Sequence, residues 1–340
     1  MNSADEALIQ GVRRRDRRAL AKAITLLEST RPDHRLRADV LLNILLPETG
    51  KAMRLGISGV PGVGKSTFIE ALGLHLIAKG KRVAVLAIDP SSSLSGGSIL
   101  GDKTRMEQLS VHEYAYIRPS PASGTLGGVA EKTREAMLVC EAAGYDIVIV
   151  ETVGVGQSET AVAGMTDMFA LMLLPNAGDD LQAIKRGVME LADLVVINKA
   201  DIDPAAASRA EAQITSALRI FSSHGKNAHA TDRWHTRVMS LSALKGQGIE
   251  TFWSHVEQFH HLRQTSGEFG ARRKQQALAW MWDIVHARLR TDFHQHPAVR
   301  HALAHTLREV SEARIAPSSA ARNLLNLFEN DASGLPPRRN

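Results

Sequence analysis

Apolar residues recur at two different spacings along the chain, and each spacing predicts a different kind of element. Near the N-terminus one stripe has the three- and four-residue spacing of a helical face: Leu20, Ala23, Ile24 and Leu27. A second helical stripe, which stops before Pro47, consists of Leu36, Val40 and Ile44. The pattern therefore predicts an N-terminal helical extension over residues 1–47.

Beyond Met53 the apolar residues gather in short continuous runs rich in Val, Ile and Leu, which are typical of strands buried on both faces. The predicted strands cover residues 54–58, 82–88, 146–150, 168–174, 194–197 and 237–241. Helical segments alternate with these runs or follow them, at residues 66–79, 128–143, 204–220 and 249–262. This alternation predicts an α/β fold with a mainly parallel central sheet covered on both sides, and we assign it to residues 48–265.

Helical spacing returns after Gly267. Two apolar stripes follow one another: Leu278, Met281, Val285 and Leu289, then Val299, Leu303, Leu307 and Val310. A third helix is expected between Pro317 and Phe328. We expect residues 266–330 to form a helical dimerisation arm, because a short arm must either wrap the sheet or pack against a second copy to bury its apolar surface. The polar tail at 331–340 contains Pro-Pro and is predicted to be disordered.

Residues 59–66 read Gly-Val-Pro-Gly-Val-Gly-Lys-Ser and fit the phosphate-binding pattern G-x-x-x-x-G-K-[ST] between a predicted strand and a predicted helix. Glycines allow a tight turn that points backbone N–H groups at phosphate, and the helix N-terminus adds partial positive charge. Lys65 is expected to reach the β- and γ-phosphates and Ser66 to bind Mg²⁺. The residues predicted to contact the nucleotide here are Gly59, Val60, Pro61, Gly62, Val63, Gly64, Lys65, Ser66 and Thr67.

A second motif, Asn198-Lys199-Ala200-Asp201, follows the predicted strand at 194–197. The Asp201 carboxylate can accept hydrogen bonds from the N1–H and the 2-amino group of guanine, a pair of donors that adenine lacks. By itself this tetrapeptide is a weak signal, but at a strand end after a phosphate loop it strongly indicates a guanine-binding site. Three further residues come directly after the last predicted strand, where a backbone amide can reach the guanine oxygen: Ser242, Ala243 and Leu244.

Three carboxylates are candidates for the metal side of the site. Asp89 and Glu151 end predicted strands, and Asp102 follows a stretch rich in glycine and serine. Carboxylate oxygens at strand ends beside a phosphate loop are the direct or water-mediated partners that Mg²⁺ prefers. The predicted metal ligands are therefore Ser66, Asp89, Asp102 and Glu151.

Glycine-rich stretches flank these carboxylates at residues 95–101, 123–128 and 154–156. Loops of this composition can become ordered around a γ-phosphate and relax after hydrolysis. The glutamine that some GTPases carry directly after Gly154 is replaced by Val155, and Gln157 comes later. Slow intrinsic hydrolysis is therefore expected.

Composition and charge exclude several classes of protein. Hydrophobic residues make up 44% and charged residues 23% of the chain, which is globular rather than disordered composition. The net charge is +5, but the basic run at 13–18 fits a solvated helix face, and 4% aromatic residues disfavour nucleic-acid binding. Neither a membrane span nor a secretory signal is expected. The single cysteine, Cys140, excludes an internal disulfide and indicates a reducing, cytoplasmic setting.

Longer stretches around these motifs resemble one family. They are Asp89-Pro-Ser-Ser-Ser, Glu151-Thr-Val-Gly-Val-Gly-Gln-Ser-Glu, and Gly178-Asp-Asp-Leu-Gln-Ala-Ile-Lys-Arg-Gly before Asn198. The chain is similar here to the GTPases associated with cobalamin-dependent acyl-CoA mutases, the methylmalonyl-CoA mutase metallochaperones. Older naming labels them arginine/ornithine transport kinases. The helix at 17–25 matches as well, and the resemblance spans about residues 10–330.

The resemblance implies a P-loop GTPase domain with helical extensions, a homodimer, and bound GTP or GDP with Mg²⁺. It implies a role in guarding or loading adenosylcobalamin on an acyl-CoA mutase, so that cobalamin is met only through this partner. A cobalamin adenosyltransferase is a second candidate partner. Asp179, Gln182 and Lys185 match a further switch used for partner-dependent activation, although Asn176 and Ala183 replace expected glycines. The residues expected to act in catalysis are Lys65, Asp89, Asp102, Glu151, Gln182 and Lys185.

Two alternative functions remain open at this stage. A kinase linked to arginine or ornithine transport would need a phosphoacceptor site, and it has no use for the guanine selectivity that Asp201 implies. A nickel-inserting GTPase usually carries segments rich in cysteine and histidine, which this sequence lacks.

Overall fold

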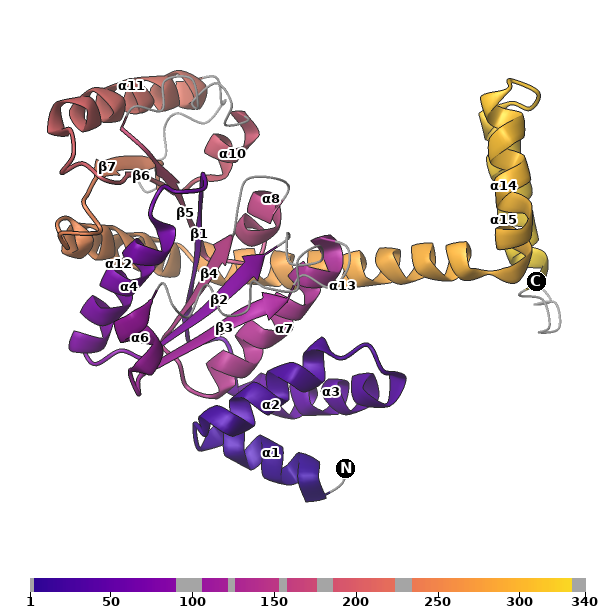
Figure 1. The fold of residues 1–340 in the computed structure, drawn as a ribbon, viewed down its shortest axis with the longest axis horizontal. Helices are drawn as coiled ribbons and strands as arrows, with labels where there is room; N and C mark the ends of the chain where they lie inside the picture. The colour runs from indigo at the N-terminus through magenta and orange to yellow at the C-terminus, as the bar shows by residue number, and fades with distance from the viewer. Residues whose placement is uncertain are drawn as a thin grey trace. The chain divides into compact units, whose positions relative to one another are not determined.

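The structure, a computed structural model, describes residues 3–89, 106–121, 126–152, 158–175, 186–223 and 234–331. Its centre is a seven-stranded sheet in the order β3-β2-β4-β1-β5-β6-β7, and every neighbouring pair is parallel (Figure 1). The strands are β1 (Met53–Gly59), β2 (Val83–Asp89), β3 (Ala115–Pro121), β4 (Ile147–Thr152), β5 (Met168–Leu173), β6 (Leu194–Ile197) and β7 (Arg237–Ser240). The predicted α/β fold with a parallel central sheet is therefore confirmed.

Alternate residues of each strand enter two separate hydrophobic cores. On β4, Val148 and Val150 belong to one core, and Ile147 and Ile149 belong to the other. Burial on both faces explains why the strands appear in the sequence as continuous apolar runs. Strand β1 lies between β4 and β5, so the strand order reverses beside it, and the carboxyl end of such a reversal is where open α/β sheets bind ligands.

Helices contribute to both cores. Those that enter the core with Ile147 are α4 (Lys65–Ala78), α6 (Glu107–Val111) and α12 (Ile249–Thr265). Those that enter the core with Val148 are α7 (Leu126–Ala142), α8 (Ser158–Ala163), α10 (Arg186–Leu191) and α11 (Pro204–Ser223). Each helix therefore packs an apolar face onto the sheet or its covering helices.

The N-terminal extension joins the core with Val148. It consists of α1 (Ser3–Arg13), α2 (Arg17–Glu28), α3 (Pro32–Leu45) and the short 3-10 helix η1 (Leu46–Glu48), and it lies against α7 (Figure 1). The stripe from Leu20 to Leu27 is buried as predicted. The second stripe was not the buried face, because Leu36 and Val40 are 70% and 46% exposed. Helix α3 instead buries Ala38, Leu41 and Leu45.

Strand β3 was not predicted. It pairs only with β2 and forms one edge of the sheet. An edge strand needs hydrogen-bond donors toward a single neighbour, so it tolerates Pro119 and Pro121, which have no N–H to donate. The same edge position lets Arg118 extend to an ion pair with Glu28 of the N-terminal extension. The strand therefore lacks the continuous apolar run that marks the others.

Buried ion pairs join the amino ends of the strands, and we call this group the amino-edge hub: Arg54, Glu141, Asp167 and Arg273. The Arg273 guanidinium donates to both oxygens of Asp167, at 2.8 and 2.6 Å, and to the carbonyls of Gly50 and Ala52, at 2.7 and 2.6 Å. Arg54 donates from Nε to Glu141 at 2.6 Å. The side chains of Asp167 and Glu141 are each 1% exposed. The hub thus ties the exit of the N-terminal extension to the start of α13 (Glu268–Gln295).

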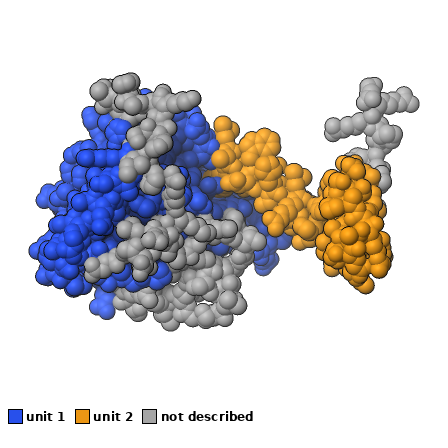
Figure 2. All heavy atoms as spheres, turned by 90° about the horizontal axis from the view of Figure 1, so that it is seen from above, with its two compact units in different colours: residues 1–276 blue, residues 277–340 orange. Residues whose placement is uncertain are grey.

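The chain divides into two compact units, residues 1–276 and 277–340, and the division falls within α13 (Figure 2). In the second unit α14 (Pro297–Ser311) packs against α15 (Pro317–Asp331). The predicted apolar stripe on α13 is exposed, with Leu278 at 59% and Leu289 at 55%. In the next stripe Val299 is buried, whereas Leu307 is 60% exposed. Within the described ranges no helix has the length and apolarity to cross a membrane.

Candidate functional site

The phosphate-loop motif forms the turn from β1 to α4 that the sequence predicted. Strand β1 ends at Gly59, and α4 begins at Lys65. Gly64 has φ +96°, and a Cβ atom there would lie 2.6 Å from Asn198 Nδ2. Only glycine meets both conditions, the left-handed backbone and the close approach of a neighbouring side chain. The loop is therefore shaped by its glycines and closed from one side by Asn198.

The Lys65 side chain folds back over its own loop. Its Nζ donates to the carbonyl of Gly59 at 2.7 Å and approaches that of Val60 at 3.3 Å, and the residue is 8% exposed. Val63 is fully buried beneath the loop, whereas Pro61, Gly62 and Thr67 are exposed. The ammonium charge thus lies at the loop where phosphate oxygens would be bound.

Glu151 lies beside the start of α4. It is 3% exposed on β4, and its Oε1 is 3.5 Å from Ser66 Oγ. Two oxygens bound side by side to one Mg²⁺ lie about 3 Å apart, so a small adjustment would let this pair share the ion. The next residue, Thr152, donates to Ser58 Oγ at 2.8 Å, and both are fully buried. That hydrogen bond fixes the end of β4 to the end of β1, directly before the phosphate loop.

The remaining predicted metal and switch residues are only partly covered by the structure. Asp89 ends β2, which pairs with β4, but its side chain is not described. Asp102, Gln182 and Lys185 lie outside the described residues, as does Asp179. Their roles therefore stay predictions.

Asn198 connects the phosphate loop with the loop after β7. Its Nδ2 donates to the carbonyl of Val63 at 2.8 Å, and its Oδ1 accepts from the backbone N–H of Ala243 at 3.0 Å. It is 2% exposed. Lys199 has φ +62°, an uncommon conformation for a residue with a side chain, and its Cε lies 4.0 Å from the Cβ position of Gly64. The three motifs found in the sequence therefore meet in one place.

Asp201 lies in the same group, with a side chain that is 12% exposed. A hydrogen bond from Ser242 and the nearby charge of Lys245 lower the pKa of Asp201, although partial loss of water opposes them. Lys245 Nζ is 3.8 Å from Asp201 Oδ2. Ser242 and Ala243 are buried, whereas Leu244 is 81% exposed, so Leu244 offers its backbone rather than an enclosed side chain. The carboxylate is thus held ionised where a guanine edge would bind.

The structure adds residues that the sequence reasoning missed. Lys245 directly follows the predicted triplet and lies near Asp201 in the structure. A basic residue at that position in the sequence could have suggested an ion pair with Asp201. Ser58 and Thr152 each stand next to a predicted site residue, and their hydroxyl groups gave no hint of pairing. Hydroxyl residues at the ends of adjacent parallel strands could have suggested that contact.

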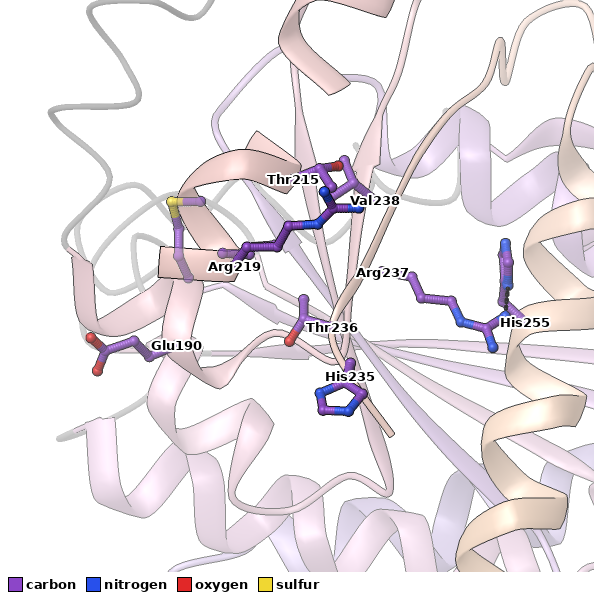
Figure 3. Close-up of a pocket in the computed structure, with 10 residues that line it drawn as sticks. Glu190, Thr215, Arg219, His235, Thr236, Arg237, Val238 and His255 are labelled. Atoms are coloured by element: carbon purple, nitrogen blue, oxygen red, sulfur yellow. Dashed lines mark hydrogen bonds between the residues drawn. The ribbon is translucent and has the colours of Figure 1, made fainter. Parts of the chain in front are cut away.

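A separate cavity of about 660 Å³ lies where β7 begins, between α10 and α11 and beside α12. Figure 3 shows Arg237 extending toward His255, to which it donates at 2.8 Å; it also donates to Gln258 at 2.7 Å. The hydroxyl of Thr236 donates to the Ala192 carbonyl at 2.8 Å. Because these groups already bind protein atoms, and none belongs to the motifs above, the cavity is not part of the candidate nucleotide site.

Comparison with known proteins gives a consistent picture. A family model described as methylmalonyl Co-A mutase-associated GTPase MeaB matches residues 20–298. A putative GTPase of Caulobacter vibrioides is 52% identical over 328 residues, covering 96% of this chain and 98% of that protein. The mitochondrial methylmalonic aciduria type A homolog of Mus musculus is 46% identical, covering 96% of this chain and 80% of that protein.

Two further similarities bear on the alternatives raised by the sequence. GTPase ArgK of Escherichia coli is 49% identical over 274 residues, covering 80% of this chain and 81% of that protein. A solved structure titled LAO/AO transport system kinase is 36% identical and has a TM-score of 0.77, covering 97% of this chain and 99% of that chain. The two names describe different activities for proteins that share this fold and much of its sequence.

Proposed function

Because the chain belongs to the family of methylmalonyl-CoA mutase-associated GTPases, we propose that it is a GTP-hydrolysing chaperone for an adenosylcobalamin-dependent acyl-CoA mutase. Its task is to assist the loading, gating or protection of adenosylcobalamin on that enzyme. The observation that carries the GTPase part is the position of Asn198, which binds the phosphate loop and the base loop at once. A P-loop GTPase of this family implies GTP or GDP and Mg²⁺ as ligands.

The phosphate side of the proposed site has residues that fit GTP with its ion. Lys65 is assigned to the β- and γ-phosphate oxygens, where a cation offsets charge that develops during transfer. Ser66 and Glu151 would hold Mg²⁺ from two sides, with Asp89 and Asp102 as further metal-side carboxylates. The ion would supply positive charge that offsets part of the negative charge on the phosphates. The 3.5 Å between Ser66 Oγ and Glu151 Oε1 supports this assignment.

The base side of the proposed site selects guanine. Asp201 would accept from N1–H and the 2-amino group, and a backbone amide of the triplet at 242–244 would reach the guanine oxygen, while the Ala243 N–H donates to Asn198. An adenine would leave the Asp201 carboxylate without those donors, which is costly for a partly buried charge. Base selection of this kind argues against the amino-acid transport kinase. It would also be expected of a nickel-inserting GTPase, so the argument against that alternative is the lack of segments rich in cysteine and histidine.

Hydrolysis is proposed to be slow without the mutase and faster with it. The segment with Asp179, Gln182 and Lys185 is the proposed contact for the partner, and Lys185 or Gln182 would then approach the nucleotide. We expect Lys185→Ala to keep the basal rate within about twofold while removing most of the stimulation, since one cation at the γ-phosphate is worth orders of magnitude in rate. Single-turnover hydrolysis with and without saturating mutase measures this. Full stimulation of the variant would contradict the assignment.

The assembly is proposed to be a cytoplasmic homodimer. The exposed apolar residues of α13 support it, because an apolar stripe on one helix is commonly covered by a second copy. Light scattering of the full chain at micromolar concentration tests this proposal, and a monomer would contradict it. A cobalamin adenosyltransferase is the second proposed partner.

The decisive experiment for the mutase role has two parts. Affinity purification from the source cell, followed by mass spectrometry, should recover an acyl-CoA mutase. The purified pair should then retain or exchange adenosylcobalamin at a rate that depends on whether GTP or GDP is present. Recovery of a transport protein, or of a nickel enzyme, would instead support the corresponding alternative.

A further inference from the structure

The first turns of α13 bind the end of α8, and we call residues 268–276 the root of α13. Arg272 Nη2 donates to the carbonyl of Ala163 at 3.3 Å, and Gln276 Nε2 donates to the carbonyl of Thr166 at 2.9 Å. Ala163 is the last residue of α8. The last carbonyls of a helix have no partner within the helix, so a donor from elsewhere must satisfy them. The root of α13 supplies donors to α8 and to the turn that follows it.

Helix α8 is in turn packed directly on the strand that leads into the phosphate loop. A Cβ atom on Gly56 of β1 would lie 2.7 Å from Val162 Cγ1 and 2.7 Å from Thr166 Oγ1. Glycine is therefore required at position 56 for α8 to lie this close to β1. Strand β1 ends at Gly59, where the phosphate loop begins. A shift of α8 against β1 and a change at the phosphate loop are thus mechanically related.

The contact between α8 and α13 is not fully satisfied. Gln276 Oε1 is buried, and no donor within the described part of the chain reaches it. A buried acceptor without a partner costs free energy, so a second arrangement that supplies a donor can compete with this one. The adjacent hub has no such defect, because Arg273 binds Asp167 and two backbone carbonyls. The root therefore combines one fixed anchor with one incomplete contact.

We propose that Arg272 and Gln276 couple the nucleotide state to α13, with Arg273 as the anchor about which the coupling operates. The inference rests on the proposed function, because it assumes that GTP and GDP bind the phosphate loop. Arg272 and Gln276 are positioning residues, since they touch α8 and its following turn, and Arg272 also approaches Asp193 at 3.7 Å, whereas neither belongs to the nucleotide motifs. The output is the helix that carries the exposed Leu278 and Leu289, so the surface proposed for assembly responds to GTP.

Hydrogen exchange of the full chain, with GDP and with a non-hydrolysable GTP analogue, tests this coupling. In the wild type, amides at residues 266–285 should exchange at rates that differ by about fivefold or more between the two nucleotides, a coupling of ordinary size. The double variant Arg272→Met with Gln276→Met should lose this difference while the amides of residues 59–68 keep theirs. The matched control, Lys274→Met with Gln275→Met, changes exposed residues of the same turn and should behave as wild type.

Three results would overturn the inference or its premise. A wild type that responds at residues 59–68 but not at 266–285 rejects the coupling and leaves the proposed function intact. A double variant that keeps the full response rejects the two residues as its carriers. A wild type whose exchange at residues 59–68 is the same without nucleotide as with either nucleotide rejects nucleotide binding itself. If the double variant fails to fold, Gln276→Met alone is used, because it removes both the donor to Thr166 and the unsatisfied oxygen.

Discussion

At the amino edge of the sheet, charged side chains bind one another, whereas at the carboxyl edge they lie beside glycine loops and backbone groups. Arg273 and Asp167 form a two-point ion pair with little exposure to water. Lys65, at the other edge, holds carbonyls of its own loop. Both edges contain buried charge, but its described contacts differ: Arg273 and Asp167 bind each other through two hydrogen bonds, whereas Lys65 donates to two carbonyls of its own glycine loop. The amino edge is thus characterised by a direct ion pair, and the carboxyl edge by a cation held against the loop that is predicted to bind phosphate.

The largest expected effect is on stability, at the hub. Arg273→Met should lower the free energy of unfolding by about 3–5 kcal/mol, because it leaves the Asp167 carboxylate buried without its cation. Chemical denaturation measures the loss. The control is Arg31→Met, which breaks the exposed pair with Asp33 and should lower the free energy of unfolding far less, because water and salt screen an exposed ion pair. Equal losses in the two variants would show that the hub is no more than a surface ion pair.

The second effect is on binding, at the opposite edge. Lys65→Ala should weaken GTP binding by about a hundredfold or more, since it removes a charge-assisted contact to phosphate from a buried position. Isothermal titration gives the affinity, and the exposed Lys51→Ala is the control. Lys65→Ala should also unfold near the wild-type temperature, so that a loss of binding reflects the missing side chain and not a loss of the fold. A variant that binds GTP normally would remove the phosphate loop from the site.

A third test compares two carboxylates on α7. Glu141 is bound by Arg54 and by the Gly50 N–H, whereas Glu135 accepts from Lys132 at 3.1 Å. Burial raises the pKa of Glu135 from its ordinary 4.5 to about 7, with the neighbouring Lys132 opposing the rise. The folded state therefore holds this proton more tightly than the unfolded state does. The contribution of Glu135 to the stability of the folded state is therefore fully present below pH 4.5 and is lost as the pH rises through 7.

Glu135→Gln should accordingly remove this pH dependence and stabilise the protein at pH 8 by about 2 kcal/mol. Unfolding curves from pH 4 to pH 8 for the variant and the wild type give the difference. Glu131→Gln removes one of the smaller causes that raise the pKa of Glu135 and leaves the burial of Glu135 in place, so this variant should keep most of the slope. A wild type that gains stability steadily up to pH 8, with the variant parallel to it, would refute the assignment.

The smallest effect concerns the choice of base. Asp201→Asn should weaken GTP binding about tenfold and improve XTP binding, because xanthine presents an oxygen where guanine has its amino group. Competition between the two nucleotides measures the change. Asp203→Asn is the control: Asp203 accepts from the Ala206 N–H at the start of α11, so its loss should affect stability and not preference. An unchanged GTP-to-XTP ratio in Asp201→Asn would contradict the assignment.

The sequence predicted the parts of the fold that periodicity and motif spacing determine. Five strands buried on both faces were visible as apolar runs, β7 was predicted as a last strand after them, and the phosphate loop was visible as a spaced set of glycines. Strand β3 was not, because an edge strand with Pro119 and Pro121 has no distinct apolar pattern. The prediction of the buried face of α3 was wrong, because helical spacing alone does not show which face of a helix the rest of the chain covers.

The candidate site shows the same division. Asn198, Asp201 and Lys65 were identified individually, but their meeting through the Val63 carbonyl and the Ala243 amide depends on backbone atoms that have no sequence signature. The amino-edge hub was missed for a further reason. Its members Arg54, Glu141, Asp167 and Arg273 lie far apart in the chain, and each alone resembles an ordinary surface charge.

The hydrogen bond from Arg273 to the Gly50 carbonyl joins residues 223 positions apart. During synthesis at about 5–20 residues per second, the Gly50 carbonyl waits roughly 10–45 seconds for its partner. Until then Asp167 and the carbonyls of Gly50 and Ala52 lack the Arg273 side chain that binds them in the folded protein. The order of synthesis therefore makes this contact one of the last that the unit of residues 1–276 can complete.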